Sequence, residues 1–453
     1  MIRGDEMAFL EATAARAALE RGEFSAVEYV SALIDRIGRL DPLIHAFLAL
    51  SPDLAIGAAR CADERRRQGR PLPPLHGLPF AVKDLIDVQN VATTAHSRVA
   101  AKIATKTATA VRRLQRQGAI YIGKLALEEF GIGSPLDDAP WPSPGNPWDR
   151  RRTAGGSSSG SAVALAAGLV PLTLGTDTGG SVRAPAAYCG GVALKPTAAR
   201  VSGEGVLPLS PTLDTIGPMA RSARDCGLLF AGLTDTGIGS FAGSAIGVVD
   251  PRTLDVAIDT DVADAMTMAV SALGSLGCPL ALVDFPYFAL GRDIGATILQ
   301  REAYVTHRTR LERAPHLYGE TTRRRLSMGA EIDDDDYEGA VRRAEHLGRQ
   351  VDAMFARCDV IATPITFGAA PLLDDAQAFR RSGDGSFRLI FNVTGHPAIV
   401  FCTGFNSDGL PLSMQLVGRR GEDERLLELA AAYQRITGWH EMHPSDPVGG
   451  PAA

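Results

Sequence analysis

Apolar runs of four to six residues, separated by polar or glycine-rich segments, recur along the 453-residue chain. Runs of this length predict buried β-strands when turn residues bound them. The runs that we interpret in this way are 119–123, 172–175, 246–249, 360–363, 398–402 and 412–417. The longer segments between them favour helices. The pattern therefore predicts a protein built from both strands and helices.

Serine and glycine are concentrated between residues 155 and 191, around an alanine-rich helical run. Within this segment, Ser181 directly follows Gly179 and Gly180. Glycine allows backbone N–H groups to turn toward a ligand. Consecutive N–H groups here can therefore form an oxyanion hole beside a nucleophilic hydroxyl. The segment predicts nucleophilic chemistry at Ser181.

A nucleophilic serine needs a base within hydrogen-bond reach. The nine histidines are scattered, and none lies in a motif that is typical of a catalytic base. Lys83 is the candidate instead, because its surroundings, LPFAVKDLIDV, are largely apolar. Burial disfavours the ammonium form, so we expect a lowered pKa for Lys83 and a neutral amine near neutral pH.

One alternative nucleophile also follows from the sequence. The segment GSSSG at 156–160 matches the G-x-S-x-G elbow of α/β-hydrolases, which would make Ser158 the nucleophile. That motif must follow a strand and enter a helix. The preceding residues, NPWDRRRTA, have the composition of a loop, which disfavours this alternative.

Taken together, the motifs resemble those of the amidase signature family of hydrolases. They are AVKD around Lys83, GGSSSGS at 155–161, GTDTGGSVRAPAAYCG at 175–190, LKPT at 194–197, LDTIGPMARS at 213–222 and DGLPLSMQLVG at 408–418. These motifs span nearly the whole chain. The resemblance implies an α/β fold with a single α/β/α domain, in which helices cover a large central mixed β-sheet. It implies no cofactor and no metal.

The resemblance also overrides the domain number that length suggests, which is about three domains of roughly 150 residues each. We expect one amidase domain over residues 1–453. Its parts are an N-terminal helical part at 1–70, a catalytic core at 71–225, a variable helical part at 235–357 and a sheet-completing part at 358–440.

Carried over to this sequence, the family pattern implies a triad. Ser181 is the nucleophile, Ser157 is a bridging serine preceded by a cis peptide bond, and Lys83 is the base. The spacing agrees with the family, because Ser181 lies 24 positions after Ser157. The backbone N–H groups implied for the oxyanion hole belong to Thr178, Gly179, Gly180 and Ser181.

Further residues are expected to support the triad or to contact the substrate. We expect Ser158, Asp177 and Arg183 around the triad, with a structural ion pair between the last two. Ser159 and Ser161 are expected to cap the start of the helix that follows. The expected substrate pocket contains Gly131, Ile132 and Trp141. The last of these belongs to a loop, PLDDAPWPSP at 135–144, that departs from the family pattern.

Composition excludes several other classes. The net charge of −6 does not indicate a nucleic-acid surface. The six cysteines are dispersed without a C-x-x-C pair, which argues against metal sites and disulfides. No apolar run approaches the roughly 20 residues of a membrane span, and the N-terminus lacks the apolar core of a signal peptide. We expect a cytoplasmic enzyme that binds a small-molecule amide and no membrane, and we leave a homodimer open.

Two functions fit the motifs, and a non-catalytic scaffold is disfavoured because a complete triad would serve no purpose there. The first is an amidohydrolase that cleaves a carboxylic amide of a small molecule to a carboxylate and ammonia or an amine, through an acyl-enzyme on Ser181. The second is the A subunit of a glutamyl-tRNA(Gln) amidotransferase, which would release ammonia from glutamine within a multi-subunit complex. The unusual loop at 135–144 leads us to favour the first.

Overall fold

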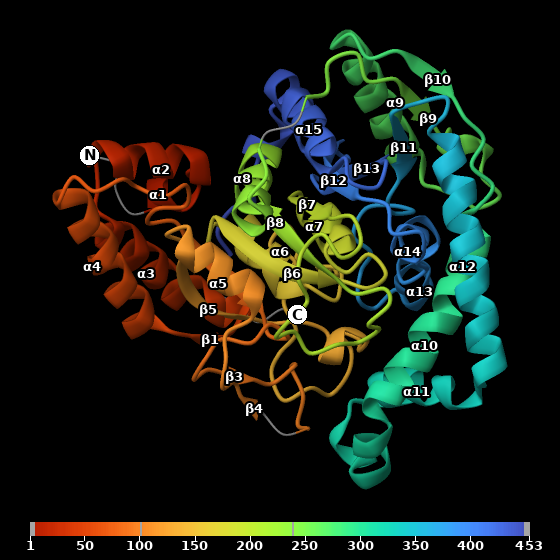
Figure 1. Ribbon diagram of the computed structural model, residues 1–453, viewed down its shortest axis with the longest axis horizontal. Helices are drawn as coiled ribbons and strands as arrows, with labels where there is room; N and C mark the ends of the chain where they lie inside the picture. The colour runs from red at the N-terminus through yellow and green to blue at the C-terminus, as the bar shows by residue number, and fades with distance from the viewer. Residues whose placement is uncertain (1–4, 100–101, 238–239, 448–453) are drawn as a thin grey trace.

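The structure is a computed structural model that describes residues 5–99, 102–237 and 240–447. Eleven strands form one mixed β-sheet across the centre of the molecule (Figure 1). In their order across the sheet, the strands are β1 (Phe47–Leu50), β5 (Ile120–Leu125), β2 (Pro79–Lys83), β6 (Leu172–Asp177), β8 (Thr215–Ala220), β7 (Val192–Lys195), β12 (Ala398–Phe405), β13 (Pro411–Gly418), β11 (Val360–Pro364), β9 (Ile246–Val248) and β10 (Leu280–Leu282).

Both strand directions occur in this sheet. Strand β2 is parallel to its neighbours β5 and β6, whereas β6 and β8 are antiparallel. The strands from β8 to β11 pair antiparallel, and β11, β9 and β10 pair parallel. A separate two-stranded sheet consists of β3 (Ala92–Thr93) and β4 (Lys102–Ile103). The predicted mixed sheet is therefore confirmed.

Fifteen α-helices flank the sheet within the described parts of the chain. They are α1 (Asp5–Ala8), α2 (Ala12–Arg21), α3 (Ala26–Ile44), α4 (Pro52–Arg67), α5 (Thr109–Arg116), α6 (Ser159–Ala166), α7 (Arg183–Cys189), α8 (Ala223–Thr234), α9 (Thr260–Ser275), α10 (Phe288–Arg313), α11 (Glu320–Ser327), α12 (Asp334–Met354), α13 (Ala376–Ser382), α14 (Ser386–Val393) and α15 (Asp423–Thr437). Helices α2 to α4 lie at one end of the molecule and α10 to α12 at the other (Figure 1).

The strands that carry the catalytic motifs lie in the middle of the sheet. Every residue of β2, β5, β6, β7 and β8 is buried. Such continuous burial is expected for strands whose sheet is covered on both faces. Lys83 ends β2 and Asp177 ends the parallel neighbour β6, so the carboxyl ends of these strands lie at the same edge.

The six predicted strands are all present, as β5, β6, β9, β11, β12 and β13. Strand β1 was not predicted, because residues 1–70 were expected to form helices alone. No helix of the described residues is long and apolar enough to cross a membrane.

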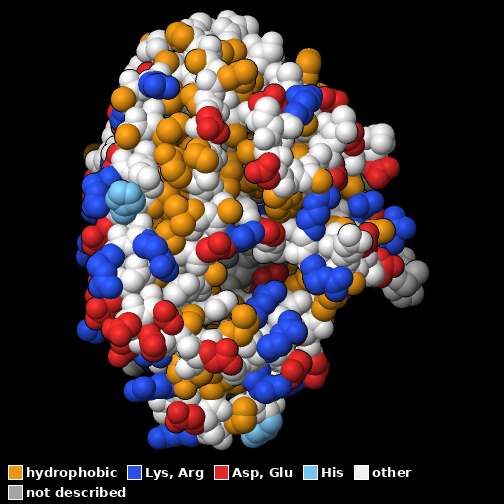
Figure 2. Space-filling model, turned by 90° about the vertical axis from the view of Figure 1, so that its right-hand side faces the viewer, with side chains coloured by type: hydrophobic (Ala, Val, Ile, Leu, Met, Phe, Trp, Pro, Cys, Tyr) orange, Lys and Arg blue, Asp and Glu red, His pale blue; other side chains and the backbone are white. Residues whose placement is uncertain are grey.

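The surface at the α10–α12 end is hollowed near its centre, and charged side chains of both signs surround the hollow (Figure 2). Hydrophobic side chains gather on the upper part of the same face (Figure 2). The edge strand β10 contributes exposed apolar side chains, with Leu282 77% exposed and Leu280 42% exposed.

Candidate active site

Lys83 and Ser157 meet in the interior, although 74 positions separate them in the sequence. The Nζ atom of Lys83 lies 2.7 Å from Ser157 Oγ and 2.9 Å from Thr176 Oγ1. Lys83 is completely buried. Burial lowers its pKa from 10.5 to about 7, although the nearby carboxyl groups, Glu128 first among them, favour the charged form. Lys83 can therefore accept a proton near neutral pH.

Two glycines, Gly156 and Gly131, lie next to Ser157, and Gly156 has no room for a side chain. The Gly156–Ser157 peptide bond is cis. A Cβ atom at Gly156 would lie 2.1 Å from the Glu128 carboxyl, and one at Gly131 would lie 3.4 Å from Ser157 Oγ. Gly131 also has a φ of +83°, which favours glycine. The absence of a side chain at Gly156 therefore allows the Glu128 carboxyl to lie beside the backbone of Ser157.

Ser157 and Ser181 line a common cavity of about 520 Å³. Thr178 and Gly179 also line it, and their N–H groups, like that of Ser181, donate to no other described residue. These three N–H groups are available to an oxyanion. The N–H of Gly180 is different, because it donates to Asp177 Oδ1 at 2.8 Å. Gly180 must therefore be removed from the predicted set of oxyanion donors.

A buried ion pair holds the loop that carries Ser181. Arg183 donates from Nε and Nη2 to the two carboxyl oxygens of Asp177, each at 3.0 Å, and both side chains are fully buried. Asn392 Nδ2 donates to the same carboxylate at 2.9 Å. Burial alone would raise the pKa of Asp177, but Arg183 and Asn392 together hold it below its usual range. The pair fixes the backbone next to the nucleophile.

Ser158 faces the sheet, and it does not line the cavity. Its Oγ donates to Thr176 O at 3.1 Å, and its N–H donates to Ser181 O at 3.0 Å. Ser158 thus links the strand β6 to the nucleophile loop. Ser159 and Ser161 lie at the start of α6, but their hydroxyls contact no hydrogen-bond partner in the described structure, which differs from the capping role expected of them.

Two of the three residues predicted for the substrate pocket line the cavity. Gly131 and Ile132 line the cavity, whereas Trp141 does not. The Trp141 ring instead packs edge-on against His96 with ring centroids 5.8 Å apart. Its backbone oxygen lies 2.9 Å from His96 Nε2.

Several charged residues of the cavity were missed by the sequence analysis. Glu128, Arg325, Arg380, Asp384 and Arg388 all line it. Nothing in the sequence marked them, because single acidic and basic residues outside a motif are usually solvated surface groups.

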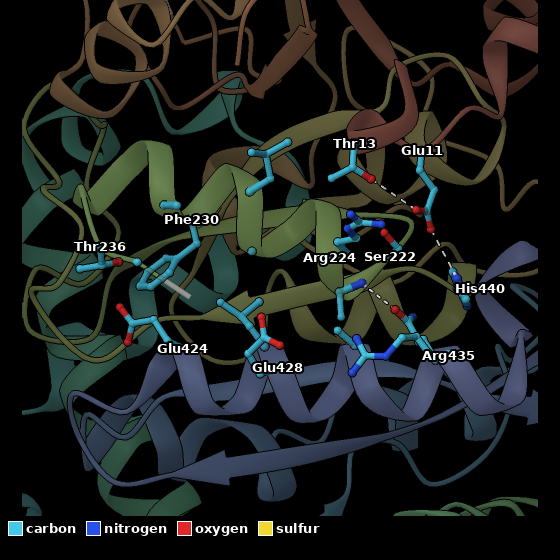
Figure 3. Close-up of a pocket in the computed structure, with 18 of the residues that line it drawn as sticks. Glu11, Thr13, Ser222, Arg224, Phe230, Thr236, Glu424, Glu428, Arg435 and His440 are labelled. Carbon is cyan, nitrogen blue, oxygen red and sulfur yellow. Dashed lines mark hydrogen bonds and ion pairs between the residues drawn. The ribbon is translucent and has the colours of Figure 1, made fainter. Parts of the chain in front are cut away.

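No histidine is among the described residues that line the cavity of Ser157 and Ser181, and no group of three acidic, histidine or cysteine side chains in this part of the chain is placed to hold a metal. A second cavity, of about 690 Å³, lies between α2, α8 and α15 (Figure 3). There His440 faces Glu11 at 3.4 Å, and Phe230 lies near Thr236. None of the predicted site residues lines this second cavity.

Ser157, Ser181 and free backbone N–H groups therefore line one cavity, and the buried Lys83 contacts Ser157 from behind its wall. A nucleophilic serine, a base and oxyanion donors are the groups that a hydrolase needs to form an acyl-enzyme. The sequence comparison gives the family. The Amidase family matches residues 28–427, and the chain belongs to this family. It is an enzyme that cleaves carbon–nitrogen amide bonds.

Its relatives are similar along nearly their entire length. The chain is 38% identical to the A subunit of the glutamyl-tRNA(Gln) amidotransferase from Chloroflexus aurantiacus, covering 97% of this chain and 99% of that one. It is 36% identical to the corresponding protein of a Roseiflexus species, covering 96% and 98%. These relatives favour the second of the two functions considered above over the first.

Solved structures show the same fold. An amidase crystal structure superposes with a TM-score of 0.87 at 30% identity, covering 94% of this chain and 99% of that one. The native peptide amidase of Stenotrophomonas maltophilia has a TM-score of 0.82 at 27% identity, covering 97% and 98%. The expected fold is confirmed by these neighbours.

Proposed function

We propose that the protein hydrolyses the side-chain amide of glutamine and releases ammonia, as the A subunit of a glutamyl-tRNA(Gln) amidotransferase. Ser181 is the nucleophile, Ser157 relays protons and Lys83 is the base. The observation that carries the chemistry is the 2.7 Å contact of Lys83 Nζ with Ser157 Oγ, in a cavity that Ser181 also lines.

Each step can be written with the described groups. Neutral Lys83 takes a proton from Ser157, which takes one from Ser181 as Ser181 Oγ bonds to the amide carbon. The N–H groups of Thr178, Gly179 and Ser181 stabilise the oxyanion. When the carbon–nitrogen bond breaks, the proton returns through Ser157 to the leaving nitrogen, and ammonia departs. Water then attacks the ester on Ser181 by the same route and releases the carboxylate.

The charges of the cavity support an amino-acid substrate. Three arginines, Arg325, Arg380 and Arg388, line the same space as the nucleophile. Arg325 Nη1 donates to the carbonyl oxygens of Ile132 and Gly133, at 2.7 Å each, which fixes the guanidinium at the cavity wall. Guanidinium groups recognise carboxylates, and glutamine presents a carboxylate beyond its side-chain amide.

A stand-alone amidase is the second candidate. Solved relatives named as an amidase and as a peptide amidase favour it, as does the loop at 135–144, which departs from the family pattern. In either role we propose a cytoplasmic location. Because the net charge is −6, we assign any contact with tRNA to partner proteins of the complex and not to this chain.

The test follows ammonia release by the purified chain from glutamine and from a panel of aliphatic, aromatic and dicarboxylic monoamides. Ser181→Ala is the control. We expect the chain to release ammonia from glutamine, and we expect Ser181→Ala to abolish this release. Partner proteins together with glutamyl-tRNA(Gln) should increase it. Efficient hydrolysis of simple amides, with no release from glutamine in the presence or absence of partners, would favour the stand-alone enzyme.

A further inference from the structure

Glu128 is an acidic residue of the cavity that the catalytic scheme above does not use. Its carboxyl group lies against Gly156, so closely that a Cβ atom there would be only 2.1 Å away. Its backbone N–H donates to Ser157 O at 3.2 Å. The carboxyl accepts no hydrogen bond and forms no ion pair with any described residue, although the side chain lines the cavity. A carboxylate in this position lacks a donor.

The other acidic residue of the cavity is already engaged. Asp384 Oδ1 accepts from Ser386 N at 2.8 Å, and its Oδ2 lies 3.5 Å from Arg292 Nη1. The two acids therefore differ in their partners, since the Asp384 carboxyl already contacts Ser386 and Arg292, whereas the Glu128 carboxyl has no described donor. Burial raises the pKa of Glu128 to about 7, partly offset by Arg325 and Lys83, so the carboxylate is present in the same pH range as neutral Lys83.

The catalytic path places the leaving nitrogen near this carboxyl. Ser157 must deliver its proton to that nitrogen, so the nitrogen has to approach Ser157 Oγ within hydrogen-bond distance. We place the carbonyl oxygen at the free N–H groups of Thr178 and Gly179, which line the cavity, and therefore on the other side of the scissile carbon from the leaving nitrogen. The amide N–H groups are then directed toward the side of the cavity where Gly156 and Glu128 lie.

We propose that Glu128 accepts a hydrogen bond from the N–H of the scissile amide and thereby makes the site specific for amides over esters of the same acid. This inference rests on the proposed function, because it assumes acyl transfer to Ser181. The hydrogen bond holds the plane of the amide against the nucleophile. An ester has no hydrogen on its leaving oxygen, so Glu128 offers it only repulsion between lone pairs.

The experiment compares glutamine with its γ-methyl ester, which have the same acyl group. Glu128→Leu removes the acceptor, and Glu128→Gln keeps one oxygen of similar position. A hydrogen bond to a charged group is worth about 1.5–3 kcal/mol, so Glu128→Leu should lower kcat/KM for the amide about 10- to 100-fold. The ester should be hydrolysed at the wild-type rate or faster. Glu128→Gln should give an intermediate loss on the amide.

Asp384→Asn is the matched control, because it removes a second carboxylate from the same cavity. It should leave the ratio of amide to ester hydrolysis at the wild-type value. Ester hydrolysis also reports that each variant is folded. An equal fall on amide and ester in Glu128→Leu, or no fall on the amide, would overturn the role of Glu128. A wild type that hydrolyses neither substrate would instead contradict the proposed function itself.

Discussion

Replacing Lys83 with methionine should abolish activity and, although the residue is buried, increase stability. Burial lowers the pKa of Lys83 from 10.5 to about 7, so the folded chain holds a neutral amine where the unfolded chain holds an ammonium. This difference costs roughly 4 kcal/mol of folding free energy near pH 7. Methionine has a similar length but loses the contacts of Nζ with Ser157 and Thr176, worth roughly 1 kcal/mol each. We expect a gain of about 1–3 kcal/mol in the free energy of unfolding.

The pH dependence of stability provides the sharper measurement. Because the folded-state pKa lies below the unfolded-state value, the unfolded chain binds more protons between about pH 7 and pH 10.5. Wild-type stability therefore gains from Lys83 as the pH rises through this window. The stability advantage of Lys83→Met should shrink by roughly 3 kcal/mol from about pH 7 to about pH 9.5. Urea unfolding followed by circular dichroism measures it at both pH values.

Lys195→Met is the matched control for this prediction. Lys195 is equally buried in β7, and burial lowers its pKa to about 7, but its Nζ donates to Pro196 O at 2.8 Å instead of contacting Ser157. The control should show a similar pH-dependent change in stability and keep wild-type activity. The reasoning is refuted if the stability difference between Lys83→Met and wild type does not change with pH. It is also refuted if Lys83→Met keeps kcat/KM within about tenfold of wild type, since a base contributes about 10²–10⁴-fold.

Three other substitutions test the structure around the triad. Asp177→Ala removes the carboxylate that neutralises the buried Arg183 and leaves it only the neutral acceptors of Gln415 and Asn392. The free energy of unfolding should fall by about 3–5 kcal/mol, and an unchanged urea midpoint would contradict this. Lys124→Met leaves Asp84 unpaired, since their 3.0 Å ion pair is buried, and calorimetry should show a loss of about 3–5 kcal/mol. His96→Asn should leave the midpoint of the acid limb of the pH–rate profile unchanged. If the acid limb disappears in this variant, a histidine is the base.

The strands could be predicted where the apolar run is unbroken, as at 398–402, which lies within β12. Strand β8 was not predicted, because Gly217 and Pro218 interrupt its apolar pattern, and both residues are unusual inside a strand. Strand β1 was missed for another reason. Its four residues, FLAL, are too short a run to distinguish a strand from a buried helical segment.

Sequence motifs also predicted only part of the active site, and the rest depends on contacts in three dimensions. Motifs identified Lys83, Ser157 and Ser181 as residues that should meet, and the structure brings the first two within 2.7 Å. Motifs could not reveal that Gly180 donates its N–H to a neighbouring carboxylate, because this depends on a side-chain rotamer. Glu128 is one of two adjacent acids in LEEF, and nothing local distinguishes a cavity residue from a surface one.

The central claim, that Ser181 carries the acyl group, is tested most directly by labelling with a serine-directed fluorophosphonate followed by peptide mass spectrometry. The account predicts a single modification on Ser181 that coincides with loss of amidase activity. Ser181→Ala should then remain unlabelled, with a wild-type circular dichroism spectrum. Labelling of Ser158, whose hydroxyl donates to the backbone of β6, or inactivation without any label on Ser181, would contradict the account.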